Sequence, residues 1–416
     1  MKLSPPLETA SLFLLDGLAN VIDFAFHFWM GRVLIPSDFA ILQTLNSLAL
    51  VYVTASGVFQ PVASRFVAEA RGRNKNDSIP AIFQTFLRAA FFLGAILSIL
   101  CFSLALPIAR LLNLPQWTIQ LSAALIFLST LRPIAAGVLQ GQERFLALGF
   151  TRLALSLGRI LFILLLVPIG INLTSAVLAL PIGWLVCVLC AFLLLGDLLW
   201  KKSGHLDRNV LSDGWKLSGY ALLAYLAYMS LTGLDLIWVN RTLDGDSAGA
   251  YASLVLMRRI VALLPGVAVM VMFPRVAKIL ATGQRPHRLL LQTALIILAA
   301  GGALTLLYFL FSNQLIAIIF GGTYQTASPL LGWMAFAMVG VSLSSIWLNY
   351  YLAERPRNFV ILLALAVALE WTLLNLFSPS LQNAVLAFGL TGWLLSFGGL
   401  ILYSGGLLRG ARRHSQ

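Results

Sequence analysis

Ionisable side chains lie inside apolar stretches of this 416-residue sequence, and their types and spacing limit the chemistry they can do. The apolar run 8–33 carries Asp16, Asn20, Asp23 and His27, a spacing that puts all four on one face of a helix. A carboxylate at the middle of a bilayer costs roughly 2.5–3.5 kcal/mol, so this face is expected to meet protein or water rather than lipid. Carboxylates in such a place could exchange a proton or a sodium ion, or balance arginines that lie at the same depth.

A second polar stripe occurs in the apolar run 214–240, where Tyr225, Tyr228, Thr232 and Asp235 again share one helical face. We predict that the two stripes line a shared polar cleft. The alternative is polar pairing across a helix interface. Two carboxylates in the first stripe suit that alternative poorly, because like charges repel and nothing nearby on that helix neutralises them. The ion-coupling residues predicted from the two stripes are Asp16, Asn20, Asp23 and Asp235.

Arginines also lie deep in apolar runs. Arg152 and Arg159 are seven residues apart with Ser156 between them, which forms one stripe, and the adjacent Arg258 and Arg259 are about eleven residues into their run. A guanidinium group stays charged and matches phosphate oxygens in a bidentate fork, so the pattern predicts a phosphate or diphosphate headgroup as ligand. Arg88 and Arg132 lie shallower, where snorkelling accounts for them equally well. The predicted substrate-binding residues are Arg88, Arg152, Arg159, Arg258 and Arg259, with Glu370 as an acid that could pair with one of the last two.

The elements that position these groups follow from composition. The chain is 60% hydrophobic and 10% charged, whereas soluble domains are about 25% charged. Its mean hydropathy is +0.91. We therefore predict an all-α integral membrane protein with about twelve spans, since twelve apolar runs can each cross about 30 Å of hydrocarbon. The runs are 8–33, 38–69, 80–110, 117–140, 146–169, 173–199, 214–240, 247–279, 287–312, 324–352, 358–377 and 382–408.

The two halves of the chain resemble each other. At an offset of 209 residues Arg32 matches Arg241 and Gly57 matches Gly266, and a one-residue slip brings Arg65 onto Arg275. Residues 1–200 and 214–416 are therefore predicted to be two six-helix bundles joined by a cytoplasmic linker, 201–213. With six spans in each half, both halves enter the membrane from the same side, which makes a parallel repeat with a site between its halves.

Basic residues are concentrated in alternate connections. By the positive-inside rule these connections, and both termini, are predicted to be cytoplasmic. The rule also accounts for most of the net charge of +13, so a nucleic-acid partner is not expected. The basic residues on the predicted cytoplasmic side include Arg71, Arg73, Lys75, Arg144, Lys201, Lys202, Arg208, Lys278, Arg285, Arg288, Arg355, Arg357, Arg409, Arg412 and Arg413.

Residues that could support an enzyme or a metal site are sparse. Cys187 and Cys190 are three apart, but their run holds no His or acid, which favours packing over metal binding. His205, His287 and His414 lie alone in short loops, without the clustered acids or histidines that a membrane enzyme needs. We therefore expect neither enzymatic activity nor a cofactor, apart from a coupling proton or sodium ion.

Three motifs resemble a known family. They are G-R-V-L-I-P-S-D-F-A at 31–40, R-F-V-A-E-A at 65–70, and Q-G-Q-E-R at 140–144 before a new span. They resemble the polysaccharide-transport branch of the multidrug/oligosaccharidyl-lipid/polysaccharide (MOP) exporter superfamily, which includes O-antigen-type flippases. The family usually has Gly where this chain has Ala40, whereas the repeat copy has Gly249.

The resemblance implies a V-shaped pair of six-helix bundles around a central cavity, working by alternating access. It implies a flippase that moves a polyprenyl-diphosphate-linked saccharide to the outer leaflet, in a membrane shared with a polysaccharide polymerase and glycosyltransferases. The drug-exporting branch of the superfamily uses acids in its first bundle to couple ion entry. Because Asp16 and Asp23 are placed to do the same, a cation-coupled multidrug antiporter remains the alternative.

Overall fold

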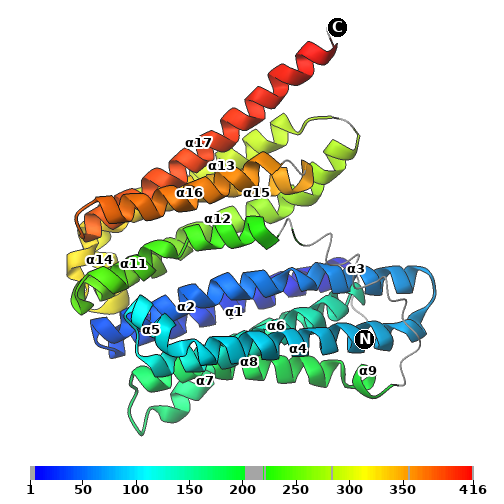
Figure 1. Cartoon of the computed structure of the whole chain (residues 1–416), viewed down its shortest axis with the longest axis horizontal. Coiled ribbons are helices and arrows are strands. Elements are labelled where there is room, and N and C mark those ends of the chain that lie inside the picture. Colours follow the sequence, from blue (N-terminus) through cyan, green and yellow to red (C-terminus); the bar gives the residue numbers. More distant parts are fainter. Residues whose placement is uncertain (1–4, 202–218, 220–221, 283, 355–356, 415–416) are drawn as a thin grey trace. The chain divides into compact units, whose positions relative to one another are not determined.

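The computed structural model describes residues 5–201, 219, 222–282, 284–354 and 357–414. This part of the chain is almost entirely helical and contains no β-strand, as the apolar runs predict (Figure 1). It forms two compact units. The first unit comprises Met1–Leu34 and Leu45–Leu226, and the second comprises Ile35–Thr44 and Ala227–Gln416. Of the predicted linker 201–213, all but Lys201 lies outside the described residues.

Eleven helical stretches are long and apolar enough to cross a membrane, and a bent helix pair raises the number to as many as twelve. The prediction of about twelve spans is thereby confirmed for the described residues, and the chain is a multi-pass membrane protein. The eleven stretches are Ser11–Val33, Pro36–Gly72, Asn76–Ser103, Gln116–Gly141, Phe145–Leu166, Leu173–Leu194, Gly245–Val269, His287–Leu310, Gln325–Leu352, Phe359–Leu376 and Leu381–Ser404.

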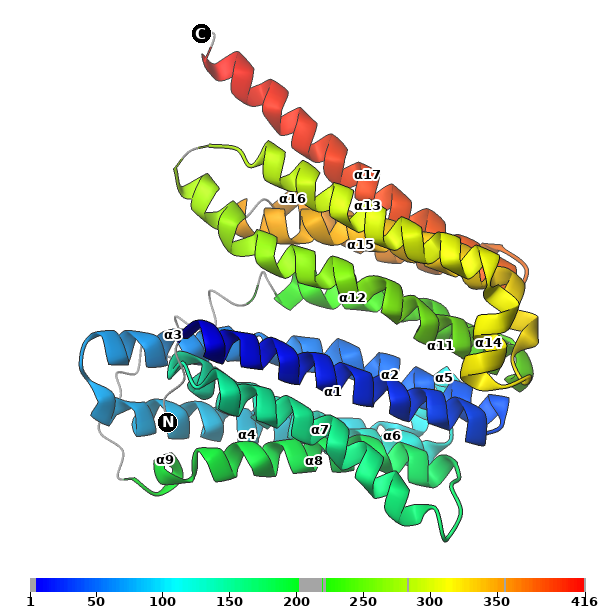
Figure 2. The same ribbon diagram turned by 180° about the vertical axis from the view of Figure 1, so that it is seen from behind.

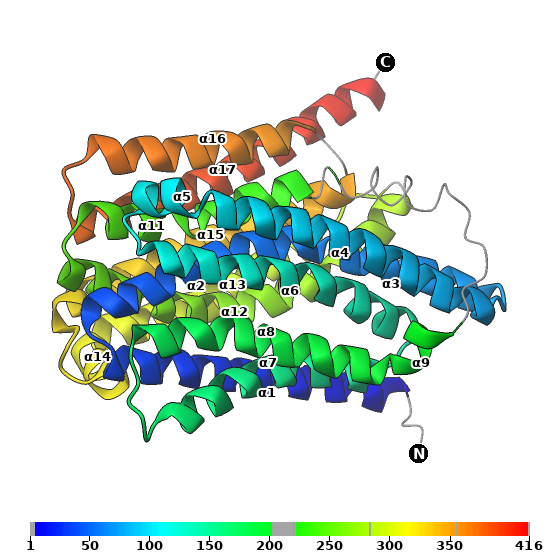
Figure 3. The ribbon, with the colours of Figure 1, turned by 60° about the horizontal axis from the view of Figure 1, so that its bottom comes forward.

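The helices of the first unit are antiparallel neighbours joined by short connections. The second and third predicted runs are each broken once, at Val58 and at Leu104, and Figure 3 shows α4 continuing past such a break into α5. The bounds are α1 Pro5–Val33, α2 Pro36–Gly57, α3 Phe59–Gly72, η1 Asn76–Ser78, α4 Ile79–Ser103, α5 Ala105–Leu112, α6 Gln116–Gly141, α7 Phe145–Leu166, α8 Leu173–Leu194 and α9 Gly196–Trp200.

Local sequence explains where several of these helices begin and end. The Asn172 side chain accepts a hydrogen bond from the Ser175 backbone N–H, and the Ser175 hydroxyl accepts one from the Asn172 backbone N–H, which caps the start of α8. Asn113, which follows α5, adopts a left-handed conformation, as does Glu143 after α6. A left-handed residue after the last turn lets the final carbonyls find partners, so it ends a helix without orphaned acceptors.

Close helix packing in the first unit depends on small residues of α6. A Cβ atom on Gly137 would lie 2.5 Å from the carbonyl oxygen of Gln60 on α3, and one on Gly141 would lie 2.6 Å from that of Ser64. Small residues at such contacts let two helix backbones approach within a membrane, where packing rather than hydrophobicity drives association. Around this contact lies an apolar core that includes Val67, Phe83 and Leu139.

The described part of the second unit is also built of helices (Figure 2). Its larger part begins at Ala227, within a helical segment, Leu222–Leu231, that leads into α11. Its remaining helices are α11 Leu234–Thr242, α12 Gly245–Ala281, α13 His287–Leu310, α14 Ser312–Phe320, η2 Gln325–Leu330, α15 Leu331–Glu354, α16 Arg357–Leu376 and α17 Leu381–His414.

The seventh predicted span differs from the continuous run that the sequence indicates. Leu222–Leu231 and α11 meet at an angle of 42°, with Thr232 and Gly233 at the break. Gly233 precedes α11 as its N-cap residue with no side-chain cap. A glycine tolerates such a junction, and the break removes the helical partner of a nearby carbonyl group. The consequence is a backbone acceptor inside the membrane that another group must satisfy.

The start of α12 carries the second copy of the turn motif. A Cβ atom on Gly249 would lie 2.5 Å from both Cβ and the carbonyl oxygen of Pro36, and one on Gly245 would lie 2.6 Å from Cβ of Ser37, so only glycine fits. Just before the helix, the backbone N–H and the hydroxyl of Ser247 both donate to Asp244, the N-cap residue. These hydrogen bonds hold the pKa of the Asp244 carboxyl below its usual range.

Candidate functional site

Two ion-paired clusters, one in each unit, contain most of the predicted site residues. In the first unit α1 packs against α7, which brings the acidic stripe of α1 against the arginine stripe of α7. Arg159 Nη1 lies 2.6 Å from Asp23 Oδ1 in an ion pair. Two turns before Arg159 on α7, Arg152 Nη2 donates at 3.2 Å to Oδ1 of Asn20, which is about one turn before Asp23 on α1. The charge of Asp23 is therefore neutralised by an arginine of a neighbouring helix. This is the polar pairing across a helix interface that the sequence left as the alternative to a cleft.

The cluster extends to α6 and α2. Asp16 is half-buried and lies in the field of both Arg152 and Arg132, the latter on α6. His27, buried on α1, lies 3.4 Å from the Asn46 amide of α2 and 3.9 Å from Asp23. We call Asp16, Asn20, Asp23, Arg132, Arg152 and Arg159 the first-unit cluster. Three guanidinium groups meet two carboxylates there, so the cluster carries an excess of positive charge.

Several hydrogen-bond donors in and beside this cluster have no acceptor among the described residues. Buried Nε atoms of Arg132 and Arg159 and the buried hydroxyl of Tyr52 have no hydrogen-bond partner in the described part of the protein. Arg152 has no carboxylate within ion-pair distance among those residues. Buried donors are normally paired because an unpaired one costs about 1–3 kcal/mol. Hydrogen-bond donors without acceptors, next to an excess of positive charge, form a site suited to an anion.

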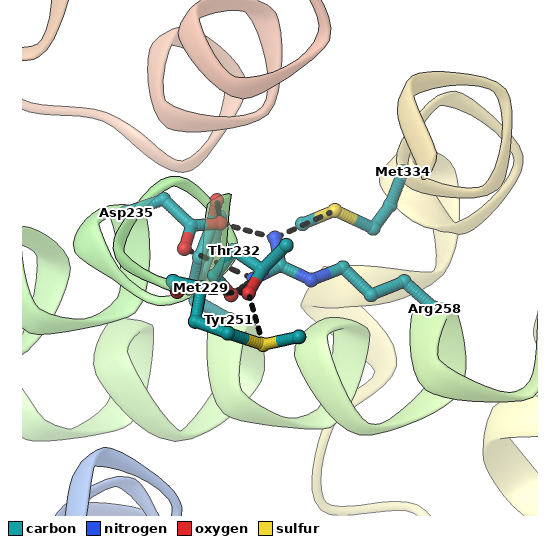
Figure 4. A network of polar contacts seen from close by, with 6 residues as sticks. All are labelled: Met229, Thr232, Asp235, Tyr251, Arg258 and Met334. Carbon is teal, nitrogen blue, oxygen red and sulfur yellow. Dashed lines mark hydrogen bonds and ion pairs between the residues drawn. The ribbon is translucent and has the colours of Figure 1, made fainter. Parts of the chain in front are cut away.

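The second-unit cluster is built around the break before α11 (Figure 4). Arg258 of α12 forms an ion pair with Asp235 of α11, and its Nη2 also donates to the Thr232 carbonyl at 2.7 Å. That carbonyl is the acceptor that the helix break leaves without its regular partner. The Tyr251 hydroxyl donates to Asp235 at 2.7 Å, and the guanidinium lies 4.0 Å from the ring centroid of Phe388. Every side of the Arg258 head group is therefore occupied by protein.

A second carboxylate lies within the field of this pair. Glu370 on α16 is fully buried and acts electrostatically on Arg258 and Asp235. Neither of its carboxylate oxygens accepts a hydrogen bond from any described residue. We call Asp235, Tyr251, Arg258 and Glu370 the second-unit cluster. One guanidinium meets two carboxylates there, the reverse of the balance in the first unit.

The remaining predicted residues are placed less centrally. Arg88 is exposed on α4 and has no ion pair within the described residues, whereas Arg259 is half-buried on α12. Tyr228 donates to the Val341 carbonyl at 3.1 Å, which makes it a packing residue of the second unit. His287 lies 2.5 Å from the Tyr403 hydroxyl, and His205 lies outside the described residues, as does the side chain of His414.

Sequence reasoning gave too little weight to Arg132 and did not single out Tyr251. Arg132 was open to a snorkelling interpretation, yet it is half-buried beside Asp16. Tyr251 follows Asp235 by sixteen residues on a different helix, so no helical spacing connects them. The sequence signal that could have found Arg132 is Pro133, which marks a polar, irregular point in a helix interior.

Comparison with known proteins decides the family. The family model described as "Polysaccharide biosynthesis protein" matches residues 8–280, well over half of the chain. The chain belongs to this family. No match was found among curated protein sequences.

Solved structures that resemble the chain are transporters. An inward-facing multidrug resistance MATE family transporter of the MOP superfamily is 13% identical with a TM-score of 0.76, over 100% of both chains. A mutant of the Vibrio cholerae MATE transporter VcmN is 14% identical with a TM-score of 0.68, over 97% of this chain and 98% of that chain. A MATE in its straight conformation is 15% identical with a TM-score of 0.62, over 99% and 95%. The predicted resemblance to the polysaccharide-transport branch of the MOP superfamily is thereby confirmed, and the solved structures show that the chain has the fold of MATE transporters.

Proposed function

We propose that this MOP-family exporter is a flippase that moves a polyprenyl-diphosphate-linked saccharide from the cytoplasmic to the outer leaflet by alternating access. The single observation that carries the proposal is the excess of guanidinium over carboxylate in the first-unit cluster. Maintaining unneutralised positive charge at membrane depth is costly, so a chain that does so is expected to use it. A lipid phosphate group is the anion that a bilayer supplies at that depth.

The phosphate is proposed to bind at Arg152 and Arg132. Arg152 is seven residues into α7, roughly 10 Å from its start at 1.5 Å per residue, a depth reachable by a headgroup that enters from the membrane surface. Its only side-chain hydrogen bond among the described residues is to the neutral Asn20, so phosphate would replace an amide rather than a carboxylate. Arg159 stays with Asp23 and positions the neighbouring donors.

Ion coupling is proposed at the acids of both clusters. Asp16 has no ion pair within the described residues, and the Asp23 side chain is 31% exposed, so a proton or sodium ion can reach these groups. In the second unit the burial of Glu370 beside Asp235 means that two negative charges share one guanidinium. Asp235 is paired with Arg258, whereas neither oxygen of Glu370 has a hydrogen-bond partner among the described residues. Glu370 is therefore proposed to be the group that takes up a proton or cation in the second unit.

The placement in the cell follows from the same proposal. The basic connections are proposed to face the cytoplasm of a bacterial inner membrane, with both termini on that side and the saccharide made by glycosyltransferases there. A polysaccharide polymerase would use the product on the opposite side.

The proposal is tested by translocation of a labelled polyprenyl-diphosphate saccharide in proteoliposomes. We expect Arg152→Gln to reduce transport by roughly tenfold or more, because a hydrogen bond to a charged group contributes about 1.5–3 kcal/mol. The control is Arg110→Gln, which removes an exposed guanidinium of α5 outside the cluster. Both proteins should reconstitute equally. Equal transport by the two variants would contradict the phosphate assignment.

The alternative, a cation-coupled multidrug antiporter, is favoured by one observation. The fold is that of MATE transporters, and the acids Asp16 and Asp23 lie on the first helix. An organic cation, however, would enter a cluster that already has more guanidinium than carboxylate. A drug-resistance assay on expressing cells separates the two functions: raised resistance that depends on Asp23 would favour the antiporter.

A further inference from the structure

A basic pocket opens at one end of the first unit, apart from both clusters. It has a volume of about 670 Å³ and is lined by Arg71, Arg144, Lys201 and Asp77, together with Asn76, Ile79, Pro80, Gln142 and Leu198. Three side chains that line it are cationic and one is anionic. The proposed transport cycle uses none of these residues.

The pocket lies where four candidate spanning stretches begin or end. Asn76 begins one of them, and Gly72, Gly141 and Leu194 end the other three. α9 continues beyond the end of α8 and lies beside the start of α4 (Figures 1 and 3). The ends of spanning helices approach the membrane–water interface, so we infer that this pocket lies within reach of phospholipid phosphates.

The cations of the pocket also satisfy helix ends, which is the simpler explanation for their presence. Arg71 Nη1 donates to the Gly141 carbonyl at 3.3 Å and pairs with Glu143 at 3.4 Å, and Arg144 Nη1 donates to the Leu194 carbonyl at 3.1 Å. Such contacts use one or two of the five N–H donors of each guanidinium. Both side chains are exposed, so their other donors face the pocket or solvent.

Backbone carbonyl oxygens near the pocket already have a hydrogen-bond donor, so they do not compete with a bound anion for the cations. The Gln84 amide donates to the carbonyls of Leu198, Leu199 and Lys201, so these oxygens at the end of α9 are already bound. The start of α4 also lines the pocket, through Ile79 and Pro80. Its N-cap residue Ser78 makes no side-chain cap, because the Ser78 hydroxyl donates to the Lys75 carbonyl. An uncapped helix start adds partial positive charge to a wall that already carries cations.

Apolar side chains beside the pocket point to a lipid rather than a free anion. Trp200, next to Lys201, is 89% exposed, and Leu193, next to Leu194, is 84% exposed. Tryptophan is enriched at the membrane–water interface, where its ring lies among headgroups and upper acyl chains. A ligand with a phosphate head and apolar tails would therefore contact both the cationic pocket and this apolar margin.

We propose that this pocket binds the phosphate headgroup of an anionic phospholipid. Arg71, Arg144 and Lys201 hold the phosphate oxygens, and Asp77 opposes them. Basic pockets between spanning helices on the cytoplasmic side are a recurring way to bind anionic headgroups. The site would make the protein's stability or activity depend on the anionic lipid content of the membrane.

The test is equilibrium binding of labelled phosphatidylglycerol to the purified full-length chain in detergent, beside phosphatidylcholine with the same acyl chains. We expect phosphatidylglycerol to bind roughly tenfold or more tightly, and Arg71→Gln with Arg144→Gln to remove that preference, since each surface cation contributes about a fivefold gain in affinity. The matched control is Arg65→Gln with Arg110→Gln, which removes the same charge from exposed positions that do not line the pocket.

A gain-of-binding variant protects the test against misfolding. Asp77→Asn removes the one anion of the pocket and should strengthen phosphatidylglycerol binding several-fold, a result that a damaged fold cannot give. Three outcomes would overturn the proposal. They are equal binding of the two lipids, equal binding by the double variant and its control, and displacement of the lipid by inorganic phosphate or a prenyl diphosphate at lower concentration than phosphatidylglycerol itself.

Discussion

Each unit holds an aspartate–arginine pair at membrane depth, but the two pairs differ in access. In the first unit the Asp23 side chain is 31% exposed and Arg159 is 7% exposed, whereas in the second unit Asp235 and Arg258 are 0% and 2% exposed. Arg258 is also bound by the Thr232 carbonyl and covered by Phe388. The Asp23 carboxylate of the first pair is therefore within reach of an ion, while the second pair holds a broken helix together.

The charge balance differs in the same way. The first-unit cluster has one guanidinium more than it has carboxylates, and the second-unit cluster has one carboxylate more than it has guanidinium groups. An offset of 211 residues aligns the Glu-Arg pair at 143–144 with that at 354–355, and at this offset Arg159 aligns with Glu370. These two aligned positions carry opposite charges. The comparison supports a proposed division of labour, with anion binding in the first unit only and ion exchange at acids of both units.

The largest expected effect comes from breaking the buried Asp235–Arg258 pair, which we call the sealed pair. Asp235→Asn leaves Arg258 buried with a weakened partner and should cost about 3–5 kcal/mol of unfolding free energy, the range for breaking one partner of a buried pair. Asp23→Asn should cost less, about 1–2 kcal/mol, because that pair is partly solvated. Thermal unfolding of the purified variants in detergent measures both.

A paired substitution serves as the control for the sealed pair. Asp235→Leu with Arg258→Met should recover most of the loss, since replacing a whole buried pair by apolar groups is often neutral. Equal losses for Asp235→Asn and Asp23→Asn would remove the distinction between the units.

The next largest effect concerns the start of α12. Gly249→Ala should destabilise the second unit by about 1–3 kcal/mol, because its new methyl group meets the Pro36 backbone and overpacking is costly. The first turn carries the buried Ala40 at its corresponding place, and Ala40→Gly should cost only about 1 kcal/mol through helix propensity. Unfolding midpoints measure both, and a harmless Gly249→Ala would show that the contact is looser than the structure gives.

A smaller effect on the fold is expected for Glu370→Gln. Because neither oxygen of Glu370 has a hydrogen-bond partner among the described residues, a neutral amide of the same shape should change the unfolding free energy by only about 1 kcal/mol or less. Transport driven by a proton or sodium gradient should nevertheless fall, since the exchangeable charge is gone. Glu354→Gln, at an exposed helix end, is the control. Unchanged gradient dependence in Glu370→Gln would assign ion coupling to the first unit alone.

The smallest effects distinguish two helix caps. Asn172→Ala in the first unit and Asp244→Ala in the second should each cost about 1 kcal/mol. Because the pKa of Asp244 is lower in the folded chain than its ordinary 3.8, its contribution is present above that pH and is lost as the pH falls through the folded pKa. The Asn172 contribution should stay constant. Unfolding midpoints at neutral pH and below pH 4 check this, and a cap effect of Asp244 that persists in acid would contradict the assignment.

Sequence pattern predicted the spans well because apolar length is a local property. It located the acidic stripe of α1 and the arginine stripe of α7 for the same reason. It could not say that α1 packs on α7, so it could not choose between ion exchange at Asp23 and the balancing of a deep arginine by Asp23, which is the contact that Arg159 makes. It also could not place Tyr251 against Asp235 or leave Glu370 without a partner, because these contacts join helices far apart in the chain.

The break at Gly233 shows the same limit more clearly. One glycine in an apolar run is common, and nothing local distinguishes this one from Gly266, which has open space around it. The helix can break at Gly233 because Arg258, on another helix, donates a hydrogen bond to the Thr232 carbonyl. The functional assignment of these residues stays a prediction, as does their division into substrate-binding and ion-coupling groups.

The measurement that tests the central claim most directly is equilibrium binding of a short-chain prenyl-diphosphate saccharide to the purified protein. Arg152→Gln in the first-unit cluster should weaken binding roughly tenfold or more. Arg241→Gln, an exposed arginine of the second unit, should leave it within about twofold, because surface charges far from a ligand are screened by salt. Equal affinity in the wild-type protein and Arg152→Gln would mean that the excess guanidinium of the first unit does not bind the diphosphate, and the proposed division of labour would be wrong.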